Sequence, residues 1–207
     1  TYVSMDFGPL SSVFVVFRPG GPRPAASETA VRDVAVIDSG WTVCFDQGGE
    51  FAPGATLPGC PEPFEADSDS LFDWSLSADP RIKYYSGTAV YRTQVKIRKK
   101  DDGARYIIDL GKVMVMAKVK VNGVCAGGVW TDPYSLDVTG LVRNGKNVIE
   151  VMVANNWMNR LVKDASLPEE ERLTWTNINP YAPDSPLQSS GLLGPVKLLK
   201  ETYESHK

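Results

Sequence analysis

Histidine is almost absent from this chain of 207 residues. The single one, His206, stands next to the last residue, and the ends of most domains are poorly ordered. A Ser-His-Asp triad, a Cys-His pair or a histidine-rich metal site therefore has no histidine available in the body of the chain. These classes of enzyme are excluded by the composition.

Cysteine is also scarce: there are three, Cys44, Cys60 and Cys125. An odd, sparse count argues against a disulfide framework. The sequence contains no C-x-x-C pair, so neither a zinc ribbon nor a thioredoxin-type site is predicted. We expect Cys44 and Cys125 to be small buried residues.

Neither a basic excess nor a long apolar run is present. The formal net charge is -3, which gives no global field to attract nucleic acid or an anionic membrane. No apolar run approaches the roughly 20 residues of a membrane-spanning helix, so no membrane span is predicted. The start, TYVSMDFGPL, lacks the basic and apolar regions of a signal peptide, and we interpret it as a processed or truncated end.

What the sequence does contain is alternation of apolar and polar residues over short segments separated by Gly and Pro. No stretch sustains a 3.6-residue period; the best helix candidates are 168–173 and the turn at 139–142, with a short helical turn at Asp73 and Trp74. Many short strands indicate an all-β sandwich or barrel. The predicted strands are 11–18, 31–37, 41–46, 88–97, 105–111, 116–123, 134–142, 147–155 and 194–201.

The glycine-rich stretch at 119–130, VKVNGVCAGGVW, has two interpretations. A phosphate-binding loop would need G-x-x-x-x-G-K-[ST] leading into a helix, and no helix is predicted after Trp130. Asn122-Gly123 between apolar runs is the strongest short signal for a β-hairpin, because a type I′ turn needs positive φ at both central residues. We expect a second turn of this kind at 143–147, and together the two turns favour an antiparallel sheet.

A family resemblance rests on these segments. Residues 85–97 and 107–155 contain, in order, Y-R, L-G, V-N-G, P-Y, D-V-T and G-K-N steps. Their order and spacing resemble the sugar-binding jelly-roll domain of family 2 glycoside hydrolases. The flanks, among them DWSLSADPRIKYYSGTAVY at 73–91 and SGLLGPVKLL at 190–199, resemble the C-terminal end of bacterial α-L-rhamnosidase-type enzymes.

The resemblance implies a galactose-binding-domain-like jelly-roll sandwich over residues 36–207. Residues 1–35 would be a strand and a Pro/Gly-rich linker from a preceding domain. Catalytic carboxylates in such enzymes lie in an upstream barrel, so the chain is expected to be a non-catalytic accessory domain whose partner is that catalytic domain. The implied substrate is a plant-type polysaccharide, and the implied location is periplasmic or extracellular. An autonomous carbohydrate-binding module and a purely structural interdomain module are the alternatives.

Aromatic residues concentrate in the second half of the chain, and Asn and Arg side chains surround Trp157. Aromatic faces stack on sugar rings while polar groups fix the hydroxyls. The candidate carbohydrate-binding residues are Trp130, Tyr134, Trp157, Asn159, Arg160 and Trp175. The alternative is structural, because Trp and Tyr fill sandwich cores, and Arg160 could pair with Asp164 or fasten the segment 156–193 to the sheet.

Acidic residues suggest two further sites. The run EADSDSLFD, with Glu65, Asp67, Asp69 and Asp73, could supply oxygen ligands to calcium but lacks the EF-hand pattern. A solvated loop is the simpler interpretation; no cofactor is assigned, and the resemblance leaves a structural calcium ion, with ligands unassigned, as an open alternative. The carboxylates of 169–171 could suggest glycosidase chemistry, but adjacent glutamates on a helix point in different directions, so no catalytic residue is assigned.

Two further predictions are structural. Asp137 and Thr139 are expected to brace the turn before Leu141, since their side-chain oxygens accept backbone N–H bonds in such turns. Arg92 is expected to form an ion pair.

Overall fold

The structure, a computed structural model, describes residues 5, 12–16, 28–46, 64–68, 70–99 and 103–204. Two antiparallel sheets share one hydrophobic core, which confirms the predicted all-β sandwich of the jelly-roll type. The larger sheet has the strand order β3 (Phe64–Ser68), β2 (Trp41–Asp46), β4 (Thr88–Ile97), β10 (Gly145–Ala154), β7 (Met116–Val121), β8 (Val124–Val129). The smaller sheet has the order β1 (Glu28–Val36), β12 (Lys197–Glu204), β5 (Arg105–Asp109), β9 (Ser135–Asp137).

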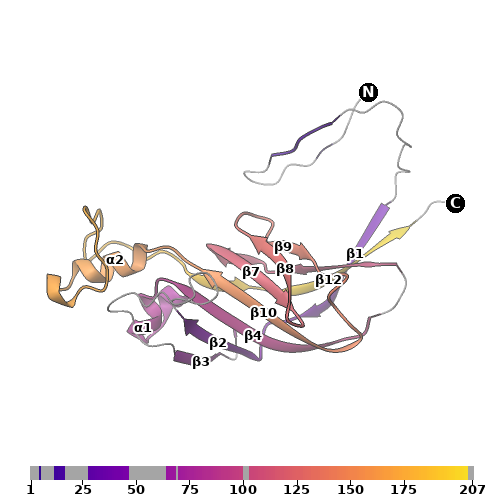
Figure 1. Cartoon of the computed structure of the whole chain (residues 1–207), viewed down its shortest axis with the longest axis horizontal. Helices are drawn as coiled ribbons and strands as arrows, with labels where there is room; N and C mark the ends of the chain where they lie inside the picture. The colour runs from indigo at the N-terminus through magenta and orange to yellow at the C-terminus, as the bar shows by residue number, and fades with distance from the viewer. Residues whose placement is uncertain are drawn as a thin grey trace.

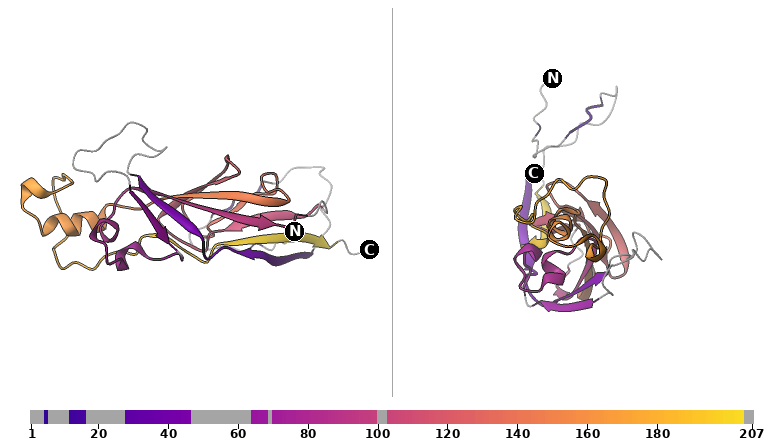
Figure 2. Two further views of the ribbon diagram at one scale, coloured as in Figure 1. Left: turned by 90° about the horizontal axis from the view of Figure 1, so that it is seen from below. Right: turned by 90° about the vertical axis from the view of Figure 1, so that its left-hand side faces the viewer.

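A short pair, β6 (Lys112–Met114) and β11 (Gly191–Gly194), forms a third sheet. Four short helical elements complete the described chain: η1 (Trp74–Leu76), α1 (Pro80–Lys83), α2 (Met158–Ala165) and η2 (Glu169–Glu171). The molecule is elongated, with α2 at one end and the start of β1 and the end of β12 at the other (Figure 1). Figure 2 shows, looking along the long axis, that α2 and its neighbouring coil lie across the end of the sandwich.

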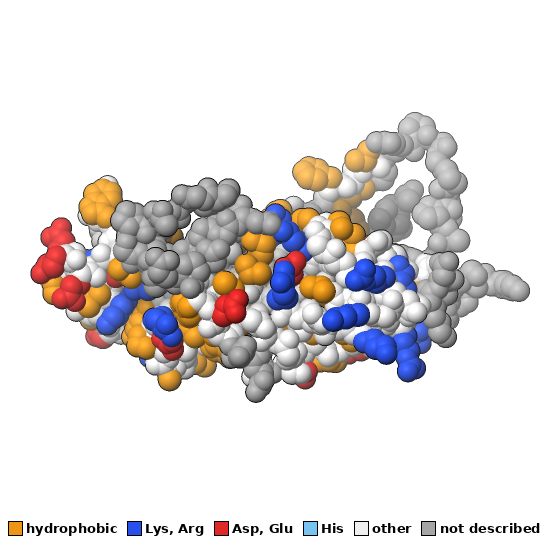
Figure 3. All heavy atoms as spheres, turned by 60° about the horizontal axis from the view of Figure 1, so that its bottom comes forward, with side chains coloured by type: hydrophobic (Ala, Val, Ile, Leu, Met, Phe, Trp, Pro, Cys, Tyr) orange, Lys and Arg blue, Asp and Glu red, His pale blue; other side chains and the backbone are white. Residues whose placement is uncertain are grey.

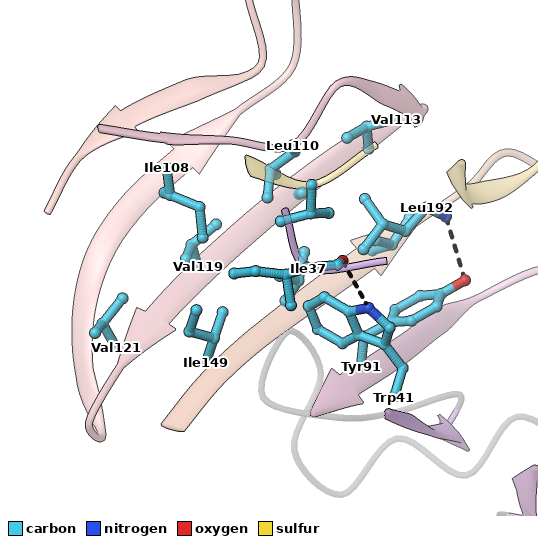
Figure 4. Packing of buried hydrophobic residues seen from close by; sticks show 14 of the residues in the cluster. Ile37, Trp41, Tyr91, Ile108, Leu110, Val113, Val119, Val121, Ile149 and Leu192 are labelled. Atoms are coloured by element: carbon cyan, nitrogen blue, oxygen red, sulfur yellow. Dashed lines mark hydrogen bonds between the residues drawn. The ribbon is translucent and has the colours of Figure 1, made fainter. Parts of the chain in front are cut away.

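Strand alternation builds the core. Along β4, Ala89, Tyr91 and Thr93 are buried while Arg92 and Gln94 are exposed, because successive side chains point to opposite faces of a sheet. Figure 4 shows buried aliphatic and aromatic side chains from both sheets converging on one another.

Hydrogen bonds between core aromatic side chains of the larger sheet and backbone groups tie in Ile37, which follows β1, and Leu192 of β11. Trp41 Nε1 donates to the carbonyl of Ile37 at 3.1 Å, and the backbone N–H of Leu192 donates to the Tyr91 hydroxyl at 3.2 Å (Figure 4). Gly191 is required beside this contact. A Cβ there would lie 2.5 Å from Trp74 Nε1, and its φ is +104°.

The Asn122-Gly123 hairpin is confirmed. It joins β7 to β8, with φ of 53° at Asn122 and 81° at Gly123, both in the left-handed region that a type I′ turn needs. The phosphate-loop interpretation is thereby removed, since the stretch is a strand, a turn and a strand.

The second predicted turn does not join paired strands. The chain runs from β9 in the smaller sheet through residues 138–144 into β10 in the larger sheet, so the turn crosses between sheets. The Asn147 side chain shapes this crossing: its Nδ2 donates to the carbonyls of Arg143 and Gly145, and its Oδ1 accepts from the Arg143 N–H.

The strand predicted over 11–18 is absent from its described part. Residues 12–16 are in neither helix nor strand, and Phe14 is 95% exposed. A strand needs a neighbour for its backbone hydrogen bonds, and no described strand pairs with these residues. The boundary predicted between residues 35 and 36 falls within β1, which pairs with β12 from Glu28 onward, so the smaller sheet begins before that boundary.

Of the other local predictions, two are confirmed and one is wrong. The Arg92 ion pair is confirmed, with Glu150 on β10 as its partner. The brace at Asp137 is confirmed too, since Asp137 Oδ1 accepts hydrogen bonds from both the N–H and the hydroxyl of Thr139. Cys125 is exposed at the edge strand β8, so its predicted burial is wrong.

Candidate functional site

A hollow of about 720 Å³ opens at the end of the sandwich that carries α2. We call it the α2 hollow. Its walls come from α2, from the chain between residues 169 and 179, and from Ser86. The lining residues are Ser86, Trp157, Arg160, Leu161, Asp164, Glu169, Arg172, Leu173, Thr174, Trp175, Thr176, Asn177 and Asn179.

The buried face of α2 is polar. Asn159, Arg160 and Asp164 are all buried there, with Val162 as the apolar member. Buried polar groups need hydrogen-bond partners, and α2 finds them in the long segment that follows it. Asp164 Oδ2 accepts from both the N–H and the hydroxyl of Thr174.

A second bond fastens the same segment to the helix. Asn179 Nδ2 donates to the carbonyl of Leu161 at 2.9 Å, while Asn179 Oδ1 accepts from the N–H of Tyr181. The wall opposite α2 is therefore held by side-chain hydrogen bonds. The chain between Leu173 and Gly191 contains no helix or strand.

Asparagines join α2 to the body of the sandwich. Asn159 is 1% exposed, and its amide binds the backbone N–H and carbonyl of Gln188 at 2.8 and 2.7 Å. Asn155 accepts from the Gly87 N–H and donates to the Tyr85 carbonyl at 2.8 Å. These amides are occupied with protein groups, so the structure places Asn159 as a brace behind the hollow.

Three of the six predicted residues line the α2 hollow: Trp157, Arg160 and Trp175. Trp157 precedes the first turn of α2 and is 49% exposed, and Trp175, on the segment that follows α2, is 81% exposed. Exposure of a large aromatic side chain leaves apolar surface available to a ligand. These two indoles are the main apolar features of the hollow.

Trp130 and Tyr134 lie elsewhere. Trp130 follows Val129 of β8, which is opposite Ala117 of β7, and its 70% exposed ring is not among the lining residues. Tyr134 is partly buried against the core, and its carbonyl accepts from the Leu110 N–H. The sequence cluster therefore separates into one set at the hollow and one set at the β8–β9 connection.

Sequence reasoning missed Arg172 and Asn177, and considered Glu169 only as a catalyst. All three line the hollow. Among the residues that the structure describes, none bonds the carboxylate of Glu169 or the side-chain amide of Asn177, and Arg172 uses only Nε, which donates to the carbonyl of Leu167. Their position on an irregular segment left no periodic signal that could have marked them.

Charge is unevenly distributed on the face that Figure 3 shows. Figure 3 shows Asp and Glu side chains gathered at the extreme left, the end that carries α2 in Figure 1, while the largest group of Lys and Arg lies to the right. Within the hollow itself the charges balance, with Arg160 and Arg172 against Asp164 and Glu169. Asp164 Oδ1 is buried and has no hydrogen-bond partner among the described residues.

A polar network anchors the base of this end to the core. Asp73 Oδ1 accepts from the Ser75 N–H and hydroxyl and from the Ser190 N–H. Burial raises the pKa of Asp73, but the hydrogen bonds from Ser189, Ser190 and Ser75 outweigh it and hold that pKa below its usual value. Beside it, Trp74 Nε1 donates to the Tyr91 hydroxyl at 2.6 Å, and burial raises the pKa of Tyr91 far above its usual value.

The calcium prediction lies partly outside the described residues, because Asp69 and the side chain of Asp67 are not described. Among described residues, no group of three or more His, Cys, Asp or Glu side chains could hold a metal ion. The structural calcium therefore stays a prediction. The described helices include none that is both long and apolar enough to span a membrane.

The fold and the comparisons with known proteins place the chain with β-sandwich parts of glycoside hydrolases. The solved structure of a rhamnosidase from Novosphingobium sp. PP1Y is similar with a TM-score of 0.74 and 37% identity, over 86% of this chain and 16% of that one. The predicted resemblance to a rhamnosidase-type sandwich is thereby confirmed. A β-glucuronidase from an uncultured Clostridium sp., 17% identical with a TM-score of 0.53, supports the fold alone.

Two curated relatives are also named as glycoside hydrolases. A protein of Formosa agariphila provisionally named a β-glucuronidase is 37% identical over 155 residues, which are 63% of this chain and 13% of that protein. A second protein of that organism, named a β-glucuronidase, is 34% identical over 101 residues. The chain thus spans less than one-fifth of the length of each of these two relatives and of the rhamnosidase. No family model matches it.

Proposed function

We propose that the chain is a non-catalytic accessory domain of a polysaccharide-degrading glycoside hydrolase of the rhamnosidase type. In this proposal it packs on the catalytic domain, extends the substrate cleft and contacts carbohydrate at the α2 hollow. The main support is the similarity to the rhamnosidase, which is 37% identical over 86% of this chain and covers only 16% of that enzyme. An accessory domain would account for that coverage, since the rest of the enzyme would carry the chemistry.

The hollow supports the carbohydrate contact. Two exposed indoles face a site that also contains Arg, Asn and Glu side chains, and sugar sites combine aromatic faces with a few convergent polar groups. A periplasmic or extracellular location and a plant-type polysaccharide belong to the same proposal. Both follow from the resemblance.

Catalysis by this chain is opposed by the setting of its two lining carboxylates. Glycoside hydrolysis needs an acid and a second carboxylate that both reach the scissile bond. Asp164 is buried, and its Oδ2 is bonded by Thr174, so one of the two is engaged in holding the wall of the hollow. A structural role for Asp164 fits this geometry better than proton transfer.

The test is a glycan-array screen of the 207-residue chain with and without calcium, followed by calorimetric titration of each hit. We expect a saturable hit that Trp157→Ala weakens about tenfold or more, by analogy with the roughly 1–3 kcal/mol that removing an aromatic stacking partner costs for a nucleic-acid base. Trp130→Ala is the matched control, since Trp130 is also an exposed tryptophan but lies outside the hollow.

Three results separate the proposal from its alternatives. Binding that neither variant weakens would place the sugar elsewhere on the sandwich. Silence on every glycan by a folded chain would favour the structural interdomain module. Hydrolysis of an aryl rhamnoside by the purified chain would contradict the non-catalytic assignment.

A further inference from the structure

We propose that the α2 hollow selects an uncharged, hydroxyl-rich sugar ring over a uronic acid, with Glu169, Arg172 and Asn177 as its polar contacts. This inference rests on the proposed carbohydrate contact and adds the ligand class and three contact residues. It is argued from the hydrogen-bonding groups that remain available in the hollow and from the balance of its charges.

The lining divides into groups already used and groups still available. Thr174 and Asn179 hold the wall to α2, and the Thr176 hydroxyl donates to the carbonyl of Ile178. The Ser86 hydroxyl donates to the carbonyl of Asn156. These groups shape the hollow, and the three hydroxyls have used their only donor, so they keep acceptor capacity alone for a ligand.

The available groups include both donors and acceptors. Arg172 keeps the four N–H bonds of its two Nη atoms, and Asn177 keeps a full amide, with no partner for either among the described residues. The Glu169 carboxylate can only accept. A sugar hydroxyl both donates and accepts, so a ring with several hydroxyls can satisfy this mixed set.

Charge balance argues against a uronic acid. Arg160 and Arg172 are matched by Asp164 and Glu169 on the same lining. A ligand carboxylate entering this site would gain from the guanidinium groups and lose against the two carboxylates, and a like charge at close range is unfavourable. An uncharged ring avoids that repulsion and can donate its hydroxyls to Glu169.

Size and shape agree with a sugar ligand. A volume of about 720 Å³ falls within the range of small-ligand sites in proteins. Trp157 and Trp175 both line the hollow and are exposed, and an exposed indole offers an apolar face to a pyranose. The exposure of Trp175 leaves the site open to a longer chain of sugars.

The experiment uses a matched ligand pair. The first ligand is an oligosaccharide containing one uronic acid; the second is the same oligosaccharide after chemical reduction of its carboxyl group to a primary alcohol. The two differ only in the charged group. Calorimetric titration of the 207-residue chain with each gives the selectivity directly, and circular dichroism confirms that every variant is folded.

We expect the reduced ligand to bind about tenfold tighter or more, in line with the loss of one charge repulsion. Arg172→Gln and Glu169→Gln should each weaken the reduced ligand about tenfold or more, the loss of one hydrogen bond to a charged group. Glu169→Gln should also narrow the gap between the two ligands. Glu170→Gln, one residue away and outside the lining, should change neither affinity.

Equal binding, or tighter binding of the uronate, would overturn the inference while leaving carbohydrate binding intact. Unchanged affinities in Arg172→Gln and Glu169→Gln would remove these residues from the site. Failure of both ligands, together with silence on the glycan array, would instead overturn the proposed carbohydrate contact itself. Failure of both alongside an array hit on another glycan would overturn the assignment of this ligand class.

Discussion

The body of the sandwich and the end that carries α2 are built on opposite principles. In the body, Trp74, Tyr91 and Leu192 are buried between paired strands, and apolar burial supplies the stabilisation. At the α2 end, the buried side chains are mostly polar, among them Asn159 and Asp164, and the chain between Leu173 and Gly191 contains no helix or strand. Apolar packing fills space, whereas hydrogen bonds from side chains can hold two segments around a cavity without filling it.

The strongest way to test this contrast is to remove one tryptophan from each region. Trp74 is 0% exposed and contacts Phe45, Tyr85 and Tyr91. Trp74→Ala should lower the free energy of unfolding by about 3–5 kcal/mol, the usual cost of deleting a buried aromatic. Trp175→Ala, at an exposed site, should stay within about 0.5 kcal/mol.

Urea unfolding followed by circular dichroism measures both changes. Equal losses in the two variants would contradict the contrast, because they would require Trp175 to be as deeply packed as Trp74.

Much of the body could be predicted from the sequence. The strands at 41–46 and 88–97 occur with the predicted bounds, because alternation and flanking turn residues both mark them. β3, β6 and β11 were missed, since they are short and lie among Gly- and Pro-rich or mixed segments. Local patterns carry little signal for strands of three to five residues.

The α2 end could be predicted only in part. α2 was missed although Met158, Leu161, Val162 and Ala165 have the spacing of an amphipathic helix, because the pattern lasts only eight residues. Trp157, Arg160 and Trp175 were identified by composition. Arg172 and Asn177 were not, because only the tertiary fold of an irregular segment brings them to the hollow.

A second prediction tests the side-chain hydrogen bonds that hold the α2 end together. Asn159→Ala should cost about 1–3 kcal/mol, because it leaves the N–H and carbonyl of Gln188 without their partner in a buried setting. It should also weaken ligand binding at the hollow, which Asn159 supports without lining. Asn156→Ala is the control at an exposed position and should cost less, and thermal unfolding compares the two. A neutral Asn159→Ala would mean that the wall is held in another way.

The third prediction concerns pH at the junction of the two regions. The folded pKa of Asp73 is lowered, so its contribution to stability is present above the unfolded value of about 3.9 and is lost as pH falls through the folded value. Asp73→Asn should lower stability at pH 7 by about 1 kcal/mol. It should also reduce the stability lost on going from pH 5 to pH 2, measured by urea unfolding at each pH. If the variant lost as much stability between pH 5 and pH 2 as the unchanged chain, Asp73 would not contribute to the loss of stability in acid.

The smallest effect is expected on the outer face of the larger sheet. Arg92 pairs with Glu150 at 2.5 Å, but its side chain is largely exposed. Arg92→Gln should therefore change the free energy of unfolding by less than about 1 kcal/mol, and less again at high salt. A larger loss of unfolding free energy that does not depend on salt would contradict this account, because it would require the Arg92 side chain to be packed in a buried setting.

The central claim is that the α2 hollow is a ligand site. Intrinsic tryptophan fluorescence tests this claim most directly. The chain would be titrated with the array-selected oligosaccharide and compared with the Trp157→Phe/Trp175→Phe double variant and with Trp130→Phe. The account predicts a saturable change in emission that Trp130→Phe retains and the double variant loses. A change that survives in the double variant, or that vanishes with Trp130→Phe, would contradict it.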